Sequence, residues 1–163
     1  MKKEKAHLPV MGVGPIYVYV IALFTLVGVI LSKTGIVYVG TPRFLRIPFI
    51  VTGAILILFG IFLWVKSVII DRIDESIKKN CLKVSGIYAY VRNPIYSAFM
   101  FLFTGILFIF NDAWLLLLPL VFWAFLTVFM KITEEKWLLK LYGDEYRQYC
   151  KRVNRCIPWF PKK

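Results

Sequence analysis

Four stretches of the chain are free of charged residues over a length that could cross a bilayer: 15–32, 47–65, 94–111 and 113–130. Each has 18 or 19 residues, which is about 27 Å of helix and close to a ~30 Å hydrocarbon core. Because hydrocarbon offers the backbone no hydrogen-bond partners, such segments must be helical. The pattern predicts an all-α integral membrane protein with four transmembrane helices and a cytosolic C-terminal helical segment.

Prolines fit this division of the chain. Pro15, Pro48 and Pro94 lie at span starts, where the missing N–H costs little. Pro119 lies inside the fourth span, where we expect a kink. The link at 111–112 is so short that the third and fourth spans are predicted to form a tight antiparallel hairpin.

Charges outside the spans are unevenly distributed. Six Lys or Arg lie within 66–92, nine lie from residue 131 onward, and the N-terminal arm adds Lys2, Lys3 and Lys5. The other loops hold only Lys33, Arg43 and Arg46. Since cytosolic loops carry the excess of Lys and Arg, both termini are predicted to be cytosolic. No convincing cleavage site follows the first stretch, so we expect a retained span rather than a signal peptide.

Composition excludes several classes of protein. The chain has 163 residues, 60% hydrophobic and 18% charged, with mean hydropathy +0.71, unlike soluble or disordered proteins. The length predicts one domain, 1–163. A net charge of +12 points to membrane lipids rather than to nucleic acid. The spans carry no midplane charge, which disfavours a pump, channel or transporter.

Metal chemistry is not expected. The chain has one histidine, His7, and three cysteines without a CxxC spacing: Cys81, Cys150 and Cys156. This set predicts no metal site and reduced thiols on the cytosolic side.

Polar and aromatic residues collect in 80–96, just before the third span. Asn93 and Pro94 are typical of a helix N-cap and first helical position. One interpretation is structural: Arg92 reaches lipid headgroups, and an interfacial belt is formed by Tyr88, Tyr90 and Tyr96. The other is functional: a helix N-terminus beside aromatic side chains can bind an anionic or polar ligand.

A second polar stretch begins where the fourth span ends. Glu134 and Glu135 lie about one helical turn from Met130, and carboxylates this close to hydrocarbon cost free energy unless they are paired or bind a cation. Gly143 is expected to end this helix. The amphipathic piece 144–153 is expected to lie on the membrane or fold back over the site, the alternative being a solvated tail on anionic lipid.

The predicted hairpin brings these two stretches together on one side of the membrane. A helix N-terminus with aromatic neighbours would face a carboxylate pair across a cleft at the water–lipid boundary. Such a cleft suits a zwitterionic or cationic ligand from the cytosol, reacting with a substrate that arrives laterally from the bilayer.

Two ordered sets of residues carry a resemblance. The first is Gly86, Tyr88, Arg92, Asn93, Pro94 and Tyr96; the second is Glu134, Glu135, Tyr142, Gly143, Tyr146, Tyr149, Arg152, Val153 and Pro158. Over about 80–158, the chain resembles the isoprenylcysteine carboxyl methyltransferase family of integral-membrane enzymes. The related phospholipid methyltransferases share part of the pattern.

The resemblance implies that S-adenosylmethionine is the cofactor and that a lipid or lipid-anchored molecule accepts the methyl group. By position, it implies cofactor contacts from Asn80, Cys81, Leu82, Lys83, Tyr88, Asn93, Pro94, Ile95, Tyr96 and Glu134. In this picture Glu134 accepts a hydrogen bond from the amino group or ribose, and the aromatic residues and helix start hold the adenine and the carboxylate.

Two positions depart from the isoprenylcysteine enzymes. Those enzymes usually read Arg-His-Pro, whereas Asn93 precedes the proline here, as in the phospholipid branch. They also carry an arginine where this chain has Met130, so Lys131 or Arg92 would supply the cation that meets an acceptor. Glu135 or a tyrosine is a candidate base for an amine or thiol acceptor, and Glu135 could instead be a supporting residue behind the cofactor contacts.

We therefore expect methyl transfer to a hydrophobic or lipid-anchored acceptor at the cytosolic membrane face. A sulfonium already activates its methyl group, so the protein supplies mainly alignment and desolvation. The alternatives are phospholipid amine N-methylation and a non-enzymatic membrane scaffold or partner subunit that holds anionic lipid.

Overall fold

The computed structural model describes residues 12–78 and 80–162, and within these ranges the chain forms helices and no strand. The predicted basic arm and His7 lie outside the described residues. The α-helices are α1 (Gly14–Lys33), α2 (Arg46–Val65), α3 (Ile73–Lys78), α4 (Pro94–Phe110), α5 (Leu118–Ile132) and α6 (Glu134–Arg152). Short helical turns are η1 (Arg43–Leu45), η2 (Lys66–Ile70), η3 (Gly86–Ala89) and η4 (Ala113–Leu117).

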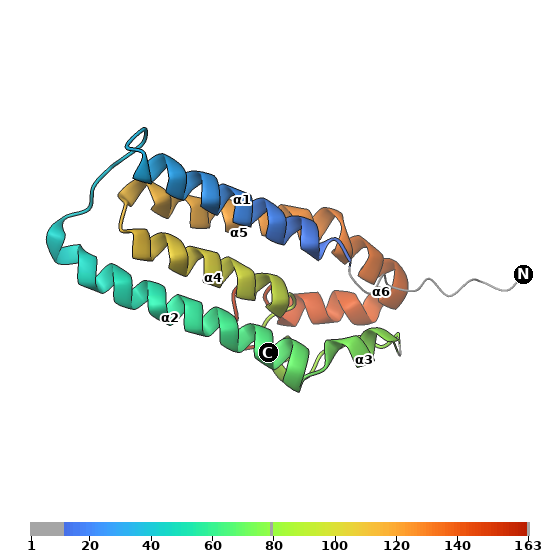
Figure 1. The fold of residues 1–163 in the computed structure, drawn as a ribbon. Helices are drawn as coiled ribbons and strands as arrows, with labels where there is room; N and C mark the ends of the chain where they lie inside the picture. Colours follow the sequence, from blue (N-terminus) through green and yellow to red (C-terminus); the bar gives the residue numbers. More distant parts are fainter. Residues whose placement is uncertain (1–11, 79, 163) are drawn as a thin grey trace, which may run out of the picture.

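Four long helices form a bundle, with α1 and α5 along one side, α2 along the other and α4 between them (Figure 1). Three helical segments are long and apolar enough to cross a membrane: Gly14–Lys33, Arg43–Ile70 and Ala113–Ile132. The prediction of four spans is met in these three, whereas α4 is an apolar helix of 17 residues. Both α3 and α6 lie at one end of the bundle, called here the α6 end.

Close packing of α4 against α2 depends on glycine. A Cβ on Gly53 would meet the carbonyl oxygen of Gly105, and one on Gly60 would meet the carbonyl of Ala98. Small residues let helix backbones approach in a membrane, where packing rather than the hydrophobic effect holds helices together. On its other side, α4 contributes Leu107 to a core shared with α1 and α5. The central helix of the bundle is therefore α4.

The end opposite α6, called here the far end, is fastened by Asp112. This carboxylate is fully buried and accepts hydrogen bonds from Ser32 Oγ at 2.5 Å and from the Val39 N–H at 3.0 Å. Together these bonds join the end of α1 to the turn between α4 and α5. The kink predicted at Pro119 is wrong, because this proline lies in the first turn of α5, directly after η4.

The C-terminal tail straps the start of α4. The Arg92 N–H donates to the Asn154 carbonyl at 2.9 Å, and the Asn93 N–H donates to the Arg155 carbonyl at 3.2 Å. Ser97 Oγ, one turn into α4, donates to the Cys156 carbonyl at 2.5 Å. The residues after α6 thereby fix the position of the helix start at the α6 end.

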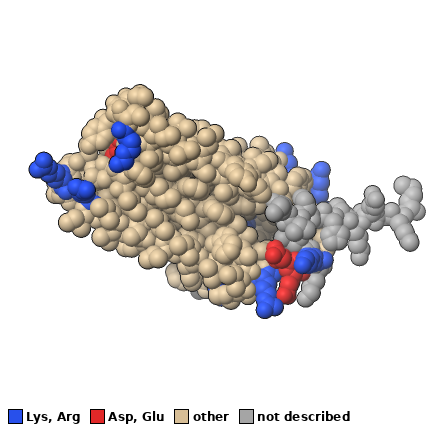
Figure 2. All heavy atoms as spheres, viewed as in Figure 1, with Lys and Arg blue, Asp and Glu red and all other residues tan. Residues whose placement is uncertain are grey.

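Charged side chains gather at the two ends of the bundle (Figure 2). On the face shown, the surface between the ends has no Lys, Arg, Asp or Glu. An uncharged surface of this kind is what a hydrocarbon core requires of the face that it contacts.

Candidate functional site

A cavity of about 550 Å³ opens at the α6 end, where residues from the starts of α1, α4 and α6 meet. Its wall is largely aromatic and aliphatic, with a few ionisable groups. Of the residues predicted to contact a cofactor, only Asn80 is not part of the wall. The others all line it: Cys81, Leu82, Lys83, Tyr88, Asn93, Pro94, Ile95, Tyr96 and Glu134.

Glu134 is the hydrogen-bonding centre of this wall. Its Oε1 accepts from the Tyr96 hydroxyl at 2.6 Å and from the Val13 N–H at 3.2 Å. Burial raises the pKa of this carboxyl, and the two hydrogen bonds oppose that rise. Glu134 thus ties α6 to α4 and to the chain entering α1, and it presents a carboxylate suited to an ammonium or hydroxyl group.

The start of α1 forms part of the wall. A Cβ on Gly12, which has a φ of +45°, would meet the Glu134 carboxylate, and a Cβ on Gly14 would meet the Tyr96 ring. Pro15 continues the wall along the helix. Glycine at positions 12 and 14 therefore allows the start of α1 to approach Glu134 and Tyr96 closely.

Tyr88 is fixed within the protein rather than at the membrane interface. Its hydroxyl shares a hydrogen bond with Ser67 Oγ at 2.6 Å, and its carbonyl accepts from the Tyr149 hydroxyl at 2.6 Å. The interfacial-belt interpretation is wrong for Tyr88, which is buried. It fits Tyr90, which is exposed and packs edge-on against Phe160.

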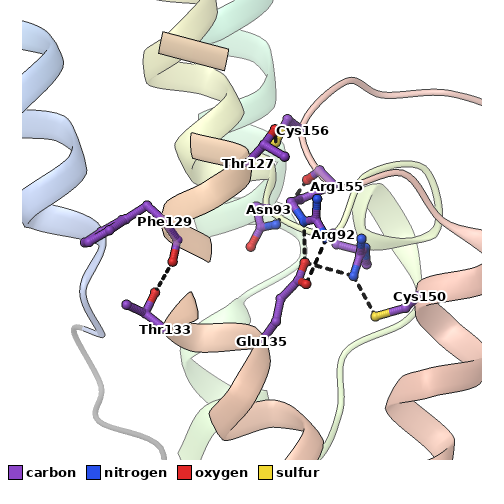
Figure 3. Close-up of polar contacts among 9 residues, drawn as sticks. All are labelled: Arg92, Asn93, Thr127, Phe129, Thr133, Glu135, Cys150, Arg155 and Cys156. Atoms are coloured by element: carbon purple, nitrogen blue, oxygen red, sulfur yellow. Dashed lines mark hydrogen bonds and ion pairs between the residues drawn. The ribbon is translucent and has the colours of Figure 1, made fainter. Parts of the chain in front are cut away.

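Glu135 lies between two guanidinium groups (Figure 3). Arg155 binds both of its oxygens, with Nε to Oε1 at 2.6 Å and Nη2 to Oε2 at 3.0 Å. Arg92 Nη1 lies 3.0 Å from Oε1 and donates to Cys150 Sγ at 2.6 Å. The interpretation of Arg92 as a headgroup-seeking residue is wrong, because only 8% of its side chain is exposed.

Asn93 occupies the N-cap position of α4 but makes no side-chain capping bond. Its Nδ2 donates instead to the Arg155 carbonyl at 3.1 Å. The side chain predicted as a helix cap therefore binds the C-terminal tail.

The amphipathic piece after Gly143 folds back over the site. Gly143 has a φ of +54° and breaks α6 into two helical parts, as its predicted role as a helix end requires. Tyr146, Tyr149 and Val153 then form a buried cluster, and the two tyrosines line the cavity. Burial raises the pKa of the neighbouring Cys150 thiol, while Arg92 opposes the rise. The alternative of a solvated tail is wrong for this face.

Two predicted catalytic residues lie away from the cavity wall. Lys131 is exposed at the end of α5, and Glu135 lies behind Arg92 in the pairing described above. Met130 is fully buried in the core of the bundle. Of the three residues predicted to be catalytic, Arg92, Lys131 and Glu135, Arg92 is the one that lines the cavity.

Several wall or supporting residues escaped the sequence reasoning. Gly12, Gly14 and Trp137 line the cavity, and Arg155 holds Glu135. The glycines directly before the first span were a usable signal, since the only residues that allow such close backbone approach are glycines. Arg155 gave no local signal, because its partner lies 20 residues earlier in the chain.

Metal ligands do not cluster in the part of the chain that the structure describes. No group of three or more His, Cys, Asp or Glu there could hold a metal ion.

Comparison with known proteins gives one family match. The family model described as phospholipid methyltransferase matches residues 48–145. The chain is 40% identical over 85 residues to a protein-S-isoprenylcysteine O-methyltransferase of Schizosaccharomyces pombe, covering 52% of this chain and 36% of that protein. It is 36% identical over 80 residues to methanethiol S-methyltransferase 1 of Bradyrhizobium diazoefficiens, covering 47% of this chain and 26% of that protein.

The matched regions thus span about a third or less of the length of these curated relatives. No solved structure matches the chain. Both matched regions and the family model concern methyltransferases, which use a methyl donor.

Proposed function

Because the chain belongs to the phospholipid methyltransferase family, we propose that it transfers a methyl group from S-adenosylmethionine to a hydrophobic or lipid-anchored acceptor. It does so as an integral membrane protein, with the α6 end and both termini in the cytosol. The described helices and the cavity they share act as one domain within 1–163. The observation that carries the proposal is a partly buried carboxylate, Glu134, set in an aromatic cavity large enough for a nucleoside and an acceptor headgroup.

The wall of the cavity fits the proposed cofactor. Its volume of about 550 Å³ lies within the usual range for small-molecule sites. Tyr142 lines the cavity and carries a buried hydroxyl with no hydrogen-bond partner among the described residues. Aromatic rings suit a purine, an unpaired hydroxyl suits a ribose or purine edge, and a carboxylate suits an ammonium group.

Within this proposal the binding residues are those that line the cavity. Glu134 accepts from the amino group or ribose, and Tyr96 keeps its carboxylate in place through the 2.6 Å hydrogen bond. Tyr88 and the first turn of α4, Asn93 to Tyr96, flank the nucleoside. The segment 81–83 contributes to the same wall, with Asn80 next to it in the chain.

The methyl-transfer step itself requires little acid–base catalysis from protein side chains. The sulfonium of the bound cofactor supplies an already activated methyl group. The protein aligns the acceptor and excludes water, which the buried aromatic wall is able to do. Glu135 is held by two arginines, and this pairing supports Arg92 rather than the role of general base. Lys131 does not line the cavity and forms no ion pair with Glu135 in the described part of the chain.

The acceptor reaches the cavity from the membrane. Val18 and Tyr19 on α1 and Phe99 on α4 line the cavity and belong to apolar helices of the bundle. An amphiphile with its tail in the bilayer can therefore place its polar end beside Arg92 and Tyr96. The relatives named above modify a prenylated cysteine and a small thiol, and acceptors with a reactive oxygen or sulfur fit the cationic surroundings of Arg92.

Calorimetry tests the cofactor assignment directly. Purified chain in detergent should bind S-adenosylhomocysteine, the demethylated product, and Glu134→Ala should remove most of that affinity because the carboxylate anchor is lost. Glu145→Ala, which removes an exposed acid from the same helix, should bind as the wild type does. Unchanged binding in Glu134→Ala would contradict the assignment of Glu134, and no binding by the wild type would favour the scaffold alternative.

The acceptor is identified by transfer of labelled methyl from S-adenosylmethionine to extracted membrane lipids. Separation of the products shows which lipid or lipid-anchored molecule gains the label. If only an aminophospholipid is labelled, the acceptor atom is an amine nitrogen, and the proposal of an oxygen or sulfur acceptor is wrong.

A further inference from the structure

The cluster of Arg92, Glu135 and Arg155 carries more positive than negative charge. Two guanidinium groups share one carboxylate, which leaves one positive charge without a partner in the cluster. Only 8% of the Arg92 side chain and 9% of the Glu135 side chain are exposed, so water screens this charge poorly. A buried cluster of this kind favours an additional anion.

Arg92 has hydrogen-bonding capacity left for that anion. Its contacts to Glu135 and Cys150 both use Nη1, while its Nε is buried and makes no hydrogen bond within the described part of the chain. A buried donor without an acceptor costs free energy. Because Arg92 also lines the cavity, a ligand bound there can contact this guanidinium group, whose positive charge the single carboxylate only partly balances.

A carboxylate is the anion that best matches the hydrogen-bond donors of a guanidinium group. The Nε edge of an arginine can hold both oxygens of a carboxylate in a planar pair of hydrogen bonds. Arg155 already binds Glu135 in this way within the same cluster. An ammonium group would instead meet the net positive charge.

We propose that the Arg92–Glu135–Arg155 cluster is a carboxylate-binding subsite of the cavity, in which Arg92 contacts the ligand and Arg155 positions Arg92 through Glu135. This inference rests on the proposed function, and two carboxylates are available to the subsite. One belongs to the amino-acid portion of the cofactor, and the other belongs to an acceptor such as an S-alkylated cysteine.

Arg155 is suited to test the subsite because it lies outside the cavity wall. Arg155→Gln removes the positioning charge and the paired bonds to Glu135. Arg155→Lys keeps the charge and should restore part of the effect. The matched control is Arg147→Gln, which removes a cation from an exposed part of α6.

Two nucleoside probes separate a local from a general effect. S-adenosylhomocysteine carries the amino-acid carboxylate, whereas 5′-methylthioadenosine lacks the whole amino-acid portion. If the cofactor carboxylate occupies the subsite, Arg155→Gln weakens S-adenosylhomocysteine at least about tenfold by calorimetry. Binding of 5′-methylthioadenosine then stays at the wild-type level, which also shows that the variant is folded.

If the acceptor carboxylate occupies the subsite, the binding of both nucleosides is unchanged. Instead, the KM for an N-acetyl-S-alkylcysteine rises at least about tenfold in Arg155→Gln, with little change in the KM for an alkanethiol of the same chain length.

Either result supports the subsite and names its ligand. Equal behaviour of Arg155→Gln and Arg147→Gln with every probe overturns the subsite while leaving the proposed function intact. So does equal weakening of both nucleosides, since that is a structural effect. If the wild type binds neither nucleoside, the proposed function itself fails and the subsite fails with it.

Discussion

A carboxylate at each end of the bundle accepts the same two kinds of donor, yet Asp112 is completely enclosed whereas Glu134 is partly buried and lines a cavity. At the far end, Asp112 accepts from a hydroxyl and a backbone N–H, those of Ser32 and Val39. At the α6 end, Glu134 accepts from the Tyr96 hydroxyl and the Val13 N–H. Both carboxylates therefore fasten α1 to the α4–α5 half of the molecule.

The difference lies in how the oxygens are used. Asp112 uses one oxygen for each donor and is completely enclosed. Glu134 receives both donors on Oε1 and lines a cavity. The comparison teaches that the same pair of donors can enclose a carboxylate completely, as at Asp112, or leave it in the wall of a cavity, as at Glu134.

The largest expected effect is on a third carboxylate, Glu135. Glu135→Ala would leave the buried Arg92 and the partly exposed Arg155 without a counter-charge and should lower the free energy of unfolding by about 3–5 kcal/mol. Thermal unfolding in detergent measures the loss. A variant as stable as the wild type would show that water reaches the cluster and that the stability of the α6 end does not depend on pairing of these charges.

Asp112→Ala is expected to reduce stability without affecting the cavity. The Ser32 hydroxyl and the Val39 N–H would lose their acceptor, which costs about 2 kcal/mol when such groups are buried. Binding of S-adenosylhomocysteine, measured by calorimetry, should stay at the wild-type level. A large loss of affinity would mean that the two ends are coupled. The contrast between a purely structural role for Asp112 and a binding role for Glu134 would then be wrong.

Gly14→Ala is expected to act on the cavity alone. The new methyl group would meet the Tyr96 ring, displace the hydroxyl from Glu134 and weaken S-adenosylhomocysteine about tenfold. Gly35→Ala is the control, because a Cβ at Gly35 meets nothing within 4 Å and the cost is limited to the strain of its positive φ. Equal affinities in the two variants would contradict the role given to the start of α1.

The smallest effect is a pH dependence specific to Glu134. Burial raises the pKa of its carboxyl above the ordinary 4.5, so between the two values the folded chain binds more protons than the unfolded chain. Stability of the ligand-free protein should therefore fall as pH rises from about 4.5 through the folded pKa. Glu134→Gln should remove this slope in thermal unfolding. An identical slope in both proteins would place the titration elsewhere.

Local patterns predicted the helices and most of the cavity wall. Uncharged stretches of bilayer length marked the four helices of the bundle, and the resemblance placed residues such as Tyr96 and Glu134 in the wall that they share. These features depend on periodicity and on order along the chain. A single sequence records both directly.

Pairing between distant residues could not be predicted in the same way. The contact between Gly53 and Gly105 depends on which helix faces α2, and the sequence analysis paired α4 with α5 alone. Likewise, the two glutamates are adjacent in sequence, but successive helical positions point in different directions. Only the packed structure shows that Glu134 borders the cavity and that Glu135 turns to Arg155.

The strap over α4 has a consequence for how the protein is made. A ribosome releases Arg92 long before Asn154 and Arg155, so the start of α4 waits for roughly sixty residues of further synthesis before its backbone partners exist. During that interval the hairpin can enter the bilayer, but the start of α4, which lines the cavity, lacks the backbone partners that fix its position. A nascent or nicked chain that ends before Arg155 would therefore lack the contacts that fix the start of α4, and this part of the cavity wall would take its position only once residues 154–156 are present.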